Sequence, residues 1–154
     1  MKILFKNATL INEKSPFHNQ KKDVLVIDGL LTQIEDQIKV EDAIIIDKKD
    51  LHLSSGWFDP CVSFGEPGYE ERETLANGLL TAAKSGFTHI VLNPDTHPAL
   101  DSLTDVSHLL QQSQGSTTAL HISASLSEAS RGENLAPLFE MHKAGAIAFG
   151  DFNT

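Results

Sequence analysis

The sequence predicts an α/β fold, in which a small antiparallel β-sheet precedes parallel strands that alternate with helices. Two observations support this fold class. Short segments rich in β-branched residues, separated by turns, fill residues 1–54, as is typical of a small antiparallel sheet. From residue 55 onward, apolar runs of strand length alternate with segments of helical periodicity, which indicates parallel βαβ units. We therefore expect two domains, residues 1–54 and residues 55–154.

The first domain is expected to consist of short strands joined by turns. Asn12-Glu13-Lys14-Ser15-Pro16 separates the first strand from the second, and Asp28-Gly29 interrupts the second, because these residue types favour turns. The predicted strands cover residues 3–11, 23–34 and 43–46.

The second domain is expected to contain four strands and three helices. A helix over residues 73–84 ends before Gly86, which is placed as a C-terminal cap, and its first turn is expected to hold the acidic run from Glu70 to Glu73. A second helix follows the capping residue Ser102, and a third covers residues 133–143. The strands are expected at residues 57–62, which we predict to be buried, and at 87–92, 118–124 and 146–149.

Four parallel strands and three helices make up about half of a (β/α)8 barrel, which typically needs about 250 residues. A half barrel leaves two edge strands whose backbone groups are unpaired. Three explanations are open for this length. The chain is a fragment of a longer protein, which we favour, or a natural half barrel completed by a partner, or an open doubly wound sheet.

Composition points away from several classes of partner. The formal net charge of -9 disfavours nucleic acid and anionic membranes, which would repel the chain. No apolar run approaches the roughly 20 residues that span a bilayer, and the start of the chain does not resemble a signal peptide. The single cysteine, Cys61, fits a reducing compartment. We expect a cytoplasmic protein.

The segment from Gly56 to Gly68 resembles the end of the first barrel strand in amidohydrolases of the dihydroorotase type, where the family pattern is G-[FIV]-[IV]-D-x-H-x-H-x-R-[ED]-P-G. Further blocks occur in the family's order. They lie at residues 66–74, 78–88, 93–98 and 143–151, and the third resembles the family's M-P-N-T-x-P. The resemblance implies the N-terminal portion of an amidohydrolase-type (β/α)8 barrel preceded by a small sheet.

The positions that perform the family's chemistry differ in this chain. The two metal-binding histidines of the family are replaced by Cys61 and Ser63, and its substrate-binding arginine by Gly65. Asp95 replaces an asparagine that contacts the substrate, and its charge would repel a substrate carboxylate. Two imidazoles at alternate strand positions can hold a metal together, whereas a hydroxyl stays protonated and one thiolate does not complete a zinc site.

Three further residues are weighed as candidates for the site. Asp59 and Asp151 match aspartates that the family retains near its metal centre, and each is also explained as a structural carboxylate. His97 follows the second barrel strand, at the end where barrel active sites gather, and is a candidate replacement ligand. His89 and His121 are expected to be partly buried structural residues. Cys61 is expected to be a small packed side chain rather than a nucleophile.

Two hypotheses for function follow from the resemblance. The first is a dihydroorotase-like protein linked to pyrimidine biosynthesis that has lost catalysis and needs no cofactor. Such a protein would act as a structural partner, for example of aspartate carbamoyltransferase, or would self-associate to cover its open barrel edges. The alternative is an active cyclic-amide hydrolase that holds zinc through remodelled ligands such as Cys61, His97 and Asp151.

Overall fold

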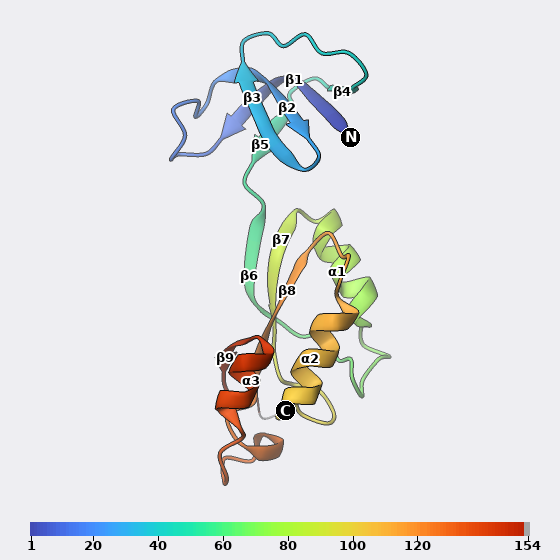
Figure 1. Cartoon of the computed structure of the whole chain (residues 1–154), viewed down its shortest axis with the longest axis vertical. Helices are drawn as coiled ribbons and strands as arrows, with labels where there is room; N and C mark the ends of the chain where they lie inside the picture. The colour runs from blue at the N-terminus through green and yellow to red at the C-terminus, as the bar shows by residue number, and fades with distance from the viewer. Residues whose placement is uncertain (153–154) are drawn as a thin grey trace. The chain divides into compact units, whose positions relative to one another are not determined.

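The computed structural model describes residues 1–152. The chain forms two compact units, Met1–Ser55 and Gly56–Thr154, which Figure 1 shows in blue to cyan and in green to red. The first unit is a small sheet and the second is a parallel sheet with helices. The predicted α/β fold class is confirmed.

Unit 1 is a five-stranded sheet in the order β3-β2-β1-β4, with β5 also pairing with β1. The antiparallel sheet that we predicted is present in β1 to β3. The two later strands pair with β1 in parallel. Parallel pairing requires a long connection between the strands, and the β-branched residues of a strand do not indicate whether it pairs in parallel or antiparallel. The strands are β1 (Lys2–Ile11), β2 (Lys21–Ile27), β3 (Leu30–Glu35), β4 (Ile44–Asp47) and β5 (His52–Ser54).

A buried carboxylate ties the strands of unit 1 to the loop that follows them. Leu4, Leu25 and Ile38 form the unit's small apolar core. Beside them, the side chain of Asp23 is only 1% exposed. It accepts hydrogen bonds from Lys6 Nζ at 2.6 Å and from the backbone N–H of Ile38 at 3.0 Å. Such partners are what makes a buried charge tolerable.

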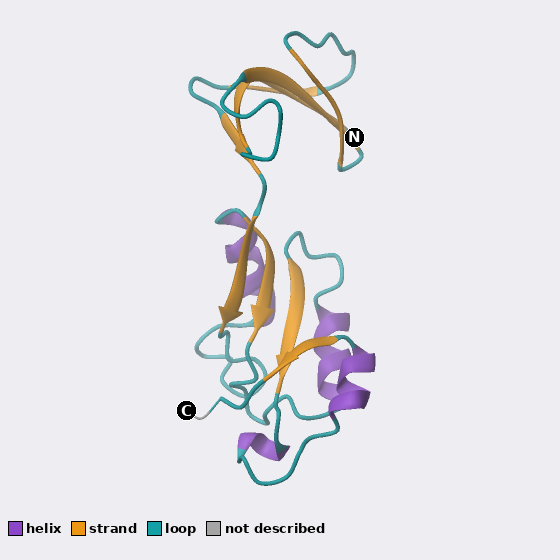
Figure 2. Cartoon of the chain, turned by 90° about the vertical axis from the view of Figure 1, so that its left-hand side faces the viewer, coloured by secondary structure: helices purple, strands orange, loops and turns teal. Residues whose placement is uncertain are grey.

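Unit 2 is a parallel sheet in the order β6-β7-β8-β9, and Figure 2 shows its helices and strands. The helices α1, α2 and α3 contact β7, β8 and β9 in turn. The elements are β6 (Trp57–Val62), α1 (Leu75–Lys84), β7 (Phe87–Leu92), α2 (Leu103–Gln112), β8 (Ala119–Ala124), the short helix η1 (Glu128–Ser130), α3 (Leu138–Ala144) and β9 (Ala146–Phe149).

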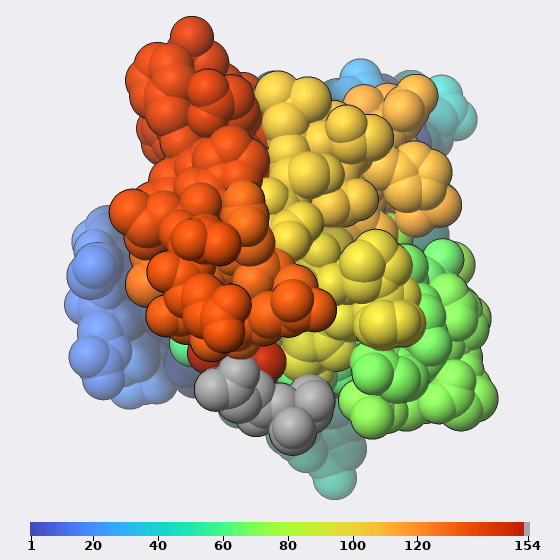
Figure 3. Space-filling view, turned by 90° about the horizontal axis from the view of Figure 1, so that it is seen from below, coloured from blue at the N-terminus to red at the C-terminus, as the bar shows by residue number. Residues whose placement is uncertain are grey.

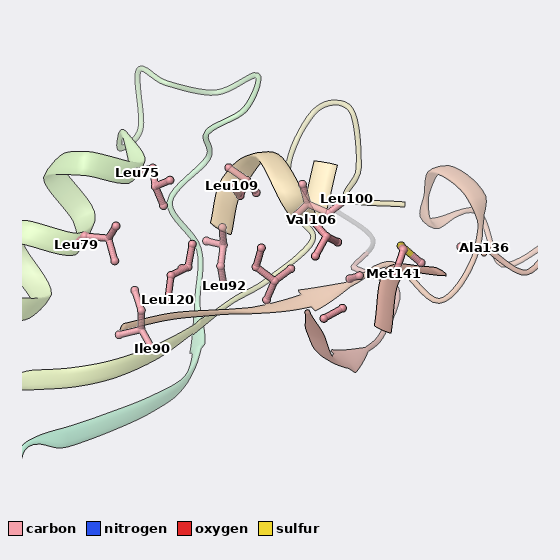
Figure 4. Close-up of a cluster of buried hydrophobic side chains, with 13 residues drawn as sticks. Leu75, Leu79, Ile90, Leu92, Leu100, Val106, Leu109, Leu120, Ala136 and Met141 are labelled. Atoms are coloured by element: carbon pink, nitrogen blue, oxygen red, sulfur yellow. The ribbon is translucent and has the colours of Figure 1, made fainter. Parts of the chain in front are cut away.

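The core of unit 2 lies between the sheet and its helices, and Figure 4 shows its side chains as sticks. Alternate residues of the strands point into this layer, as the two-residue period of a strand requires. The largest contributors include Leu75 and Leu79 of α1, Ile90 and Leu92 of β7, Val106 and Leu109 of α2, Leu120 and Ile122 of β8, and Met141 of α3.

Strand β6 is not the buried strand that we predicted. Trp57 is 59% exposed and Phe58 is 55% exposed. The reason is topological, because β6 lies at one end of the sheet order and pairs with β7 alone within unit 2. The composition of β6 is as apolar as that of a central strand, but its edge position leaves one side of the strand without a neighbouring strand in unit 2.

Helix α3 begins later than its apolar spacing predicts. It starts at Leu138 rather than at residue 133, and Pro137 occupies its N-cap position. The preceding residues are extended, since Leu135 forms an isolated antiparallel bridge with Ser127. A proline inside a helix removes a hydrogen bond and clashes with the preceding turn, whereas a proline at the start is tolerated.

The acidic run before α1 also lies differently from our expectation. The helix begins at Leu75, its first turn holds no acidic residue, and Thr74 is the N-cap. The carboxylate of Glu66 instead accepts a hydrogen bond from the backbone N–H of Leu75 at 2.6 Å. This contact places a negative charge at the helix N-terminus, where the exposed N–H groups favour it.

His89 and His121 contact each other on neighbouring strands. Their rings stack with centroids 5.3 Å apart, and His89 Nδ1 lies 3.0 Å from His121 Nε2. His89 is exposed, which contradicts the prediction of a partly buried residue, whereas His121 is partly buried. Both lie on the sheet face opposite Ile90 and Leu120, because side chains alternate along a strand.

Across residues 1–152, no helix combines the length and the apolar character needed to cross a membrane.

Candidate functional site

The sequence differences noted above gather at the carboxyl ends of the parallel strands, where α/β folds place their ligand sites. Cys61 and Ser63 lie at the end of β6, and Asp95 and His97 follow β7. Asp151 follows β9. Figure 3 looks onto this end of unit 2, with the segment after β6 in green, the segment after β7 in yellow and the segment after β8 in orange.

Asn93 joins the two positions that replace the family's metal-binding histidines. Its Nδ2 donates hydrogen bonds to Cys61 Sγ and to Ser63 Oγ, each at 3.2 Å. Its backbone N–H donates to the carbonyl of Val62 at 2.9 Å, which holds the end of β7 against the end of β6. Asn93 is buried, so this bridge is shielded from solvent on the side of β7.

This arrangement does not suit the zinc ion that the family resemblance implies. A metal ligand offers a lone pair to the cation. Here the sulfur of Cys61 and the hydroxyl of Ser63 instead receive N–H hydrogens from one amide, so the amide fills the place between them. Within residues 1–152, no three histidine, cysteine, aspartate or glutamate side chains lie together in a way that could hold a metal ion.

Cys61 differs from its predicted role as a packed side chain. It is exposed and forms no disulfide within residues 1–152, and its partner is the Asn93 amide rather than an apolar neighbour. Exposure follows from the edge position of β6, which no neighbouring strand covers on its outer side within unit 2.

Gly65 cannot hold a side chain in its observed conformation. Its φ is +113°, and a Cβ built on it would lie 2.5 Å from the carbonyl oxygen of Tyr69. The turn is closed by a hydrogen bond from the N–H of Tyr69 to the carbonyl of Gly65 at 2.9 Å. The loop has therefore adopted a backbone path that excludes the arginine of the family pattern.

Asp95 and His97 lie on the loop that follows β7. Asp95 Oδ1 is buried and has no hydrogen-bond partner among the described residues. His97 is exposed, and the centroid of its ring lies 6.2 Å from the centroid of the Tyr69 ring. Both residues line one cavity with Tyr69. Cys61 and Asp151 do not line it, so the proposed set Cys61, His97 and Asp151 is not brought together there.

The two retained aspartates have structural partners. Asp59 Oδ1 accepts a hydrogen bond from the backbone N–H of Cys61 at 3.0 Å. Asp151 accepts from both the backbone N–H and the hydroxyl of Ser127, each at 2.8 Å. These bonds to Ser127 lower the pKa of Asp151 below its ordinary value, and they fasten the end of the described chain to the loop after β8.

Asn93 is the residue of this site that sequence reasoning missed. In the sequence it stands at the end of an apolar run, before a proline, where an asparagine is readily explained as a turn-forming residue. The signal was available in the block 93–98, because Asn93 stands where the family pattern has methionine. A polar amide in that place is unexpected unless it has polar partners, and Cys61 and Ser63 supply them.

No family model matches the chain. Curated relatives do match it along almost its whole length. The dihydroorotase of Caldanaerobacter subterraneus subsp. tengcongensis is 32% identical over 98% of this chain and 35% of its own length. The dihydroorotase of Pediococcus pentosaceus is 34% identical, again over 98% of this chain and 35% of its own length. The chain thus spans about a third of the length of the curated relatives that it matches.

Solved structures show the same fold. L-hydantoinase from Arthrobacter aurescens superposes with a TM-score of 0.78 at 24% identity, over 96% of this chain and 32% of its own. A dihydroorotase crystal structure superposes with a TM-score of 0.66 at 12% identity, over 96% and 41%. The fold is therefore that of the N-terminal part of an amidohydrolase barrel. Within that class, the curated relatives that the chain matches at 32% and 34% identity are dihydroorotases.

Proposed function

We propose that this chain belongs to a dihydroorotase-like protein that does not hydrolyse dihydroorotate. The observation that carries the proposal is the hydrogen bonding of Asn93 Nδ2 to both Cys61 and Ser63. Metal-dependent hydrolysis needs a cation that lowers the pKa of its bound water. Where the family has two imidazoles to bind that cation, this chain has a thiol and a hydroxyl that both accept hydrogen bonds from the Asn93 amide.

The substrate-binding positions support the same proposal. Dihydroorotate bears a carboxylate, which a guanidinium can bind through two parallel hydrogen bonds. Gly65 offers no such group, and its conformation leaves no room for one. Asp95 adds a negative charge at the other contact position, so a bound carboxylate would be repelled rather than held.

The first test measures bound metal and turnover together. Protein purified from zinc-supplemented medium is expected to contain well below one zinc per chain and to leave L-dihydroorotate unchanged. The dihydroorotase of Pediococcus pentosaceus, prepared in parallel, serves as the active control. One or more zinc ions per chain together with turnover of dihydroorotate would contradict the proposal.

The alternative of an active cyclic-amide hydrolase with remodelled ligands receives a sharper test from a variant. If zinc and activity are found, Cys61→Ala should remove both under that alternative. Activity that survives Cys61→Ala would exclude Cys61 as a ligand. The exposed position of the thiol means that this substitution leaves the core of unit 2 intact.

A protein without catalysis can still act by binding. The resemblance points to aspartate carbamoyltransferase as the partner, and the exposed apolar residues of β6 support a binding role for that edge. The single cysteine and the acidic composition support a cytoplasmic location for this pairing.

Sedimentation of the chain with aspartate carbamoyltransferase tests the binding role. We expect a joint species that Phe58→Lys on β6 abolishes. Leu80→Lys, which places the same charge at an exposed position of α1, should leave the species unchanged. A dimer of the chain alone that Phe58→Lys abolishes would instead support self-association through this edge, and no association of either kind would refute the binding role.

A further inference from the structure

The loops at the carboxyl ends of the strands enclose a cavity of about 290 Å³. Its lining comes from the loop after β6 (Tyr69), the loop after β7 (Asp95 and Asp101), the loop after β8 (Arg131) and the residues after β9 (Phe152). At about 30 Å³ for each water in the liquid, this volume holds about ten non-hydrogen atoms. The cavity is thus of a size for a small molecule.

Asp95 forms no ion pair among the described residues. Its Oδ1 is buried without a hydrogen-bond partner among the described residues. A buried polar atom that has lost water and gained no donor is costly, and more so when it is charged. Oδ1 itself is closed to solvent, whereas other atoms of Asp95 line the cavity. A positively charged group held in the cavity would offset the charge of the carboxylate through the part that borders the cavity.

The lining also contains a second carboxylate and one guanidinium. Asp101 adds a second carboxylate, whose Oδ2 accepts a hydrogen bond from the backbone N–H of Ala129 at 2.7 Å. Arg131 is exposed and lies in no ion pair among the described residues. Glu128 and Glu133 line the neighbouring hollow together with Arg131, so acidic side chains outnumber this guanidinium around the two hollows.

Two aromatic rings complete the lining. The guanidinium of Arg72 lies 4.3 Å from the centroid of the Tyr69 ring, so this ring already accepts a cation. Phe152 also borders the cavity. Aromatic faces attract cations, and a cation held between rings and a carboxylate is a recurring mode of recognition.

We propose that this cavity binds a small organic cation that bears N–H donors, a primary amine or guanidine of about ten non-hydrogen atoms, with Asp95 as its counter-ion. The inference goes beyond the loss of dihydroorotate hydrolysis, because it assigns a ligand class to a cavity that Cys61 and Ser63 do not line. It requires no metal and no turnover.

Three probes of nearly equal size and different charge test this assignment: benzylamine, benzyl alcohol and benzoate. Titrations of the isotope-labelled chain should show benzylamine shifting the backbone amide signals of Thr96 and Ala129, while benzoate leaves them unchanged. Asp95→Asn, which keeps the side chain's shape, should weaken benzylamine binding at least about tenfold, the effect of losing one charge-assisted contact. Glu71→Gln removes one charge from an exposed position of the same unit and should not alter binding.

Several outcomes would overturn the proposal. Benzoate or benzyl alcohol binding as tightly as benzylamine would show that charge does not select the ligand. Benzylamine signals that move only outside the cavity, or an affinity unchanged by Asp95→Asn, would show that Asp95 is not the counter-ion. Asp95-dependent binding of L-dihydroorotate would also refute the cationic assignment. Turnover is measured separately, so these results are distinguishable from a failure of the proposed loss of hydrolysis.

Discussion

Asp23→Ala is expected to destabilise unit 1 by about 3 kcal/mol, the cost of breaking a buried charge pair by removing one partner. The substitution leaves the buried backbone N–H of Ile38 without an acceptor, and it leaves Lys6 without its counter-ion. It also frees the N–H of Asn7, which donates to Asp23 Oδ1 at 3.0 Å. Because small domains are stable by about 5–15 kcal/mol, this loss is a large share of the total.

Hydrogen exchange of the peptides that contain β1 and β2 measures this effect directly. Asp36→Ala is the matched control, because Asp36 is exposed and pairs with Lys22 at the surface, where such pairs contribute about 0–1 kcal/mol. The control should leave exchange in β1 and β2 nearly unchanged. Equal protection in Asp23→Ala and in the unsubstituted chain would contradict the structural role of Asp23.

The contribution of Asp23 also depends on pH. Burial opposes its ionisation, but hydrogen bonds from Lys6, Ile38 and Asn7 outweigh burial and lower its pKa in the folded state. A carboxyl group with a lowered folded-state pKa stabilises the fold above its unfolded pKa of about 3.9. That stabilisation disappears as pH falls through the folded-state pKa. The stability difference between the unsubstituted chain and Asp23→Asn should therefore be constant near neutral pH and shrink below about pH 4.

Periodicity predicted the fold well because it reports the features that burial imposes. The helical spacing of Leu75 and Leu79 and the capping residue Ser102 identified α1 and α2, and the structure confirms both. What periodicity lacks is the position of a strand in the sheet. Trp57 and Phe58 look like central-strand residues, and only the pairing order shows that β6 is an edge.

The candidate site shows the same limit at the level of single residues. The replacements at four positions can be recognised in the sequence because the family pattern marks those positions: Cys61, Ser63, Gly65 and Asp95. Their consequences depend on contacts across strands. The register that aligns Val62 with Leu92 brings Asn93 beside the end of β6, and this pairing has no local sequence signal.

Gly65 illustrates how a backbone change can matter more than the missing side chain. Gly65→Ala is expected to destabilise unit 2 by at least about 2 kcal/mol, because a residue with a Cβ is strained at positive φ by about 1–3 kcal/mol and here also meets the backbone of Tyr69 at 2.5 Å. Urea unfolding followed by the fluorescence of Trp57, the single tryptophan of the chain, measures the change.

Gly115→Ala is the matched control for this prediction. Gly115 has a φ of +83° and nothing within 4 Å of a built Cβ, so it incurs the conformational strain without the collision. The difference between the two variants isolates the contact with Tyr69. Gly65→Arg should be at least as unstable as Gly65→Ala and should not create binding of dihydroorotate. A Gly65→Arg variant as stable as the unsubstituted chain would show that this loop can return to a path that holds the family's arginine.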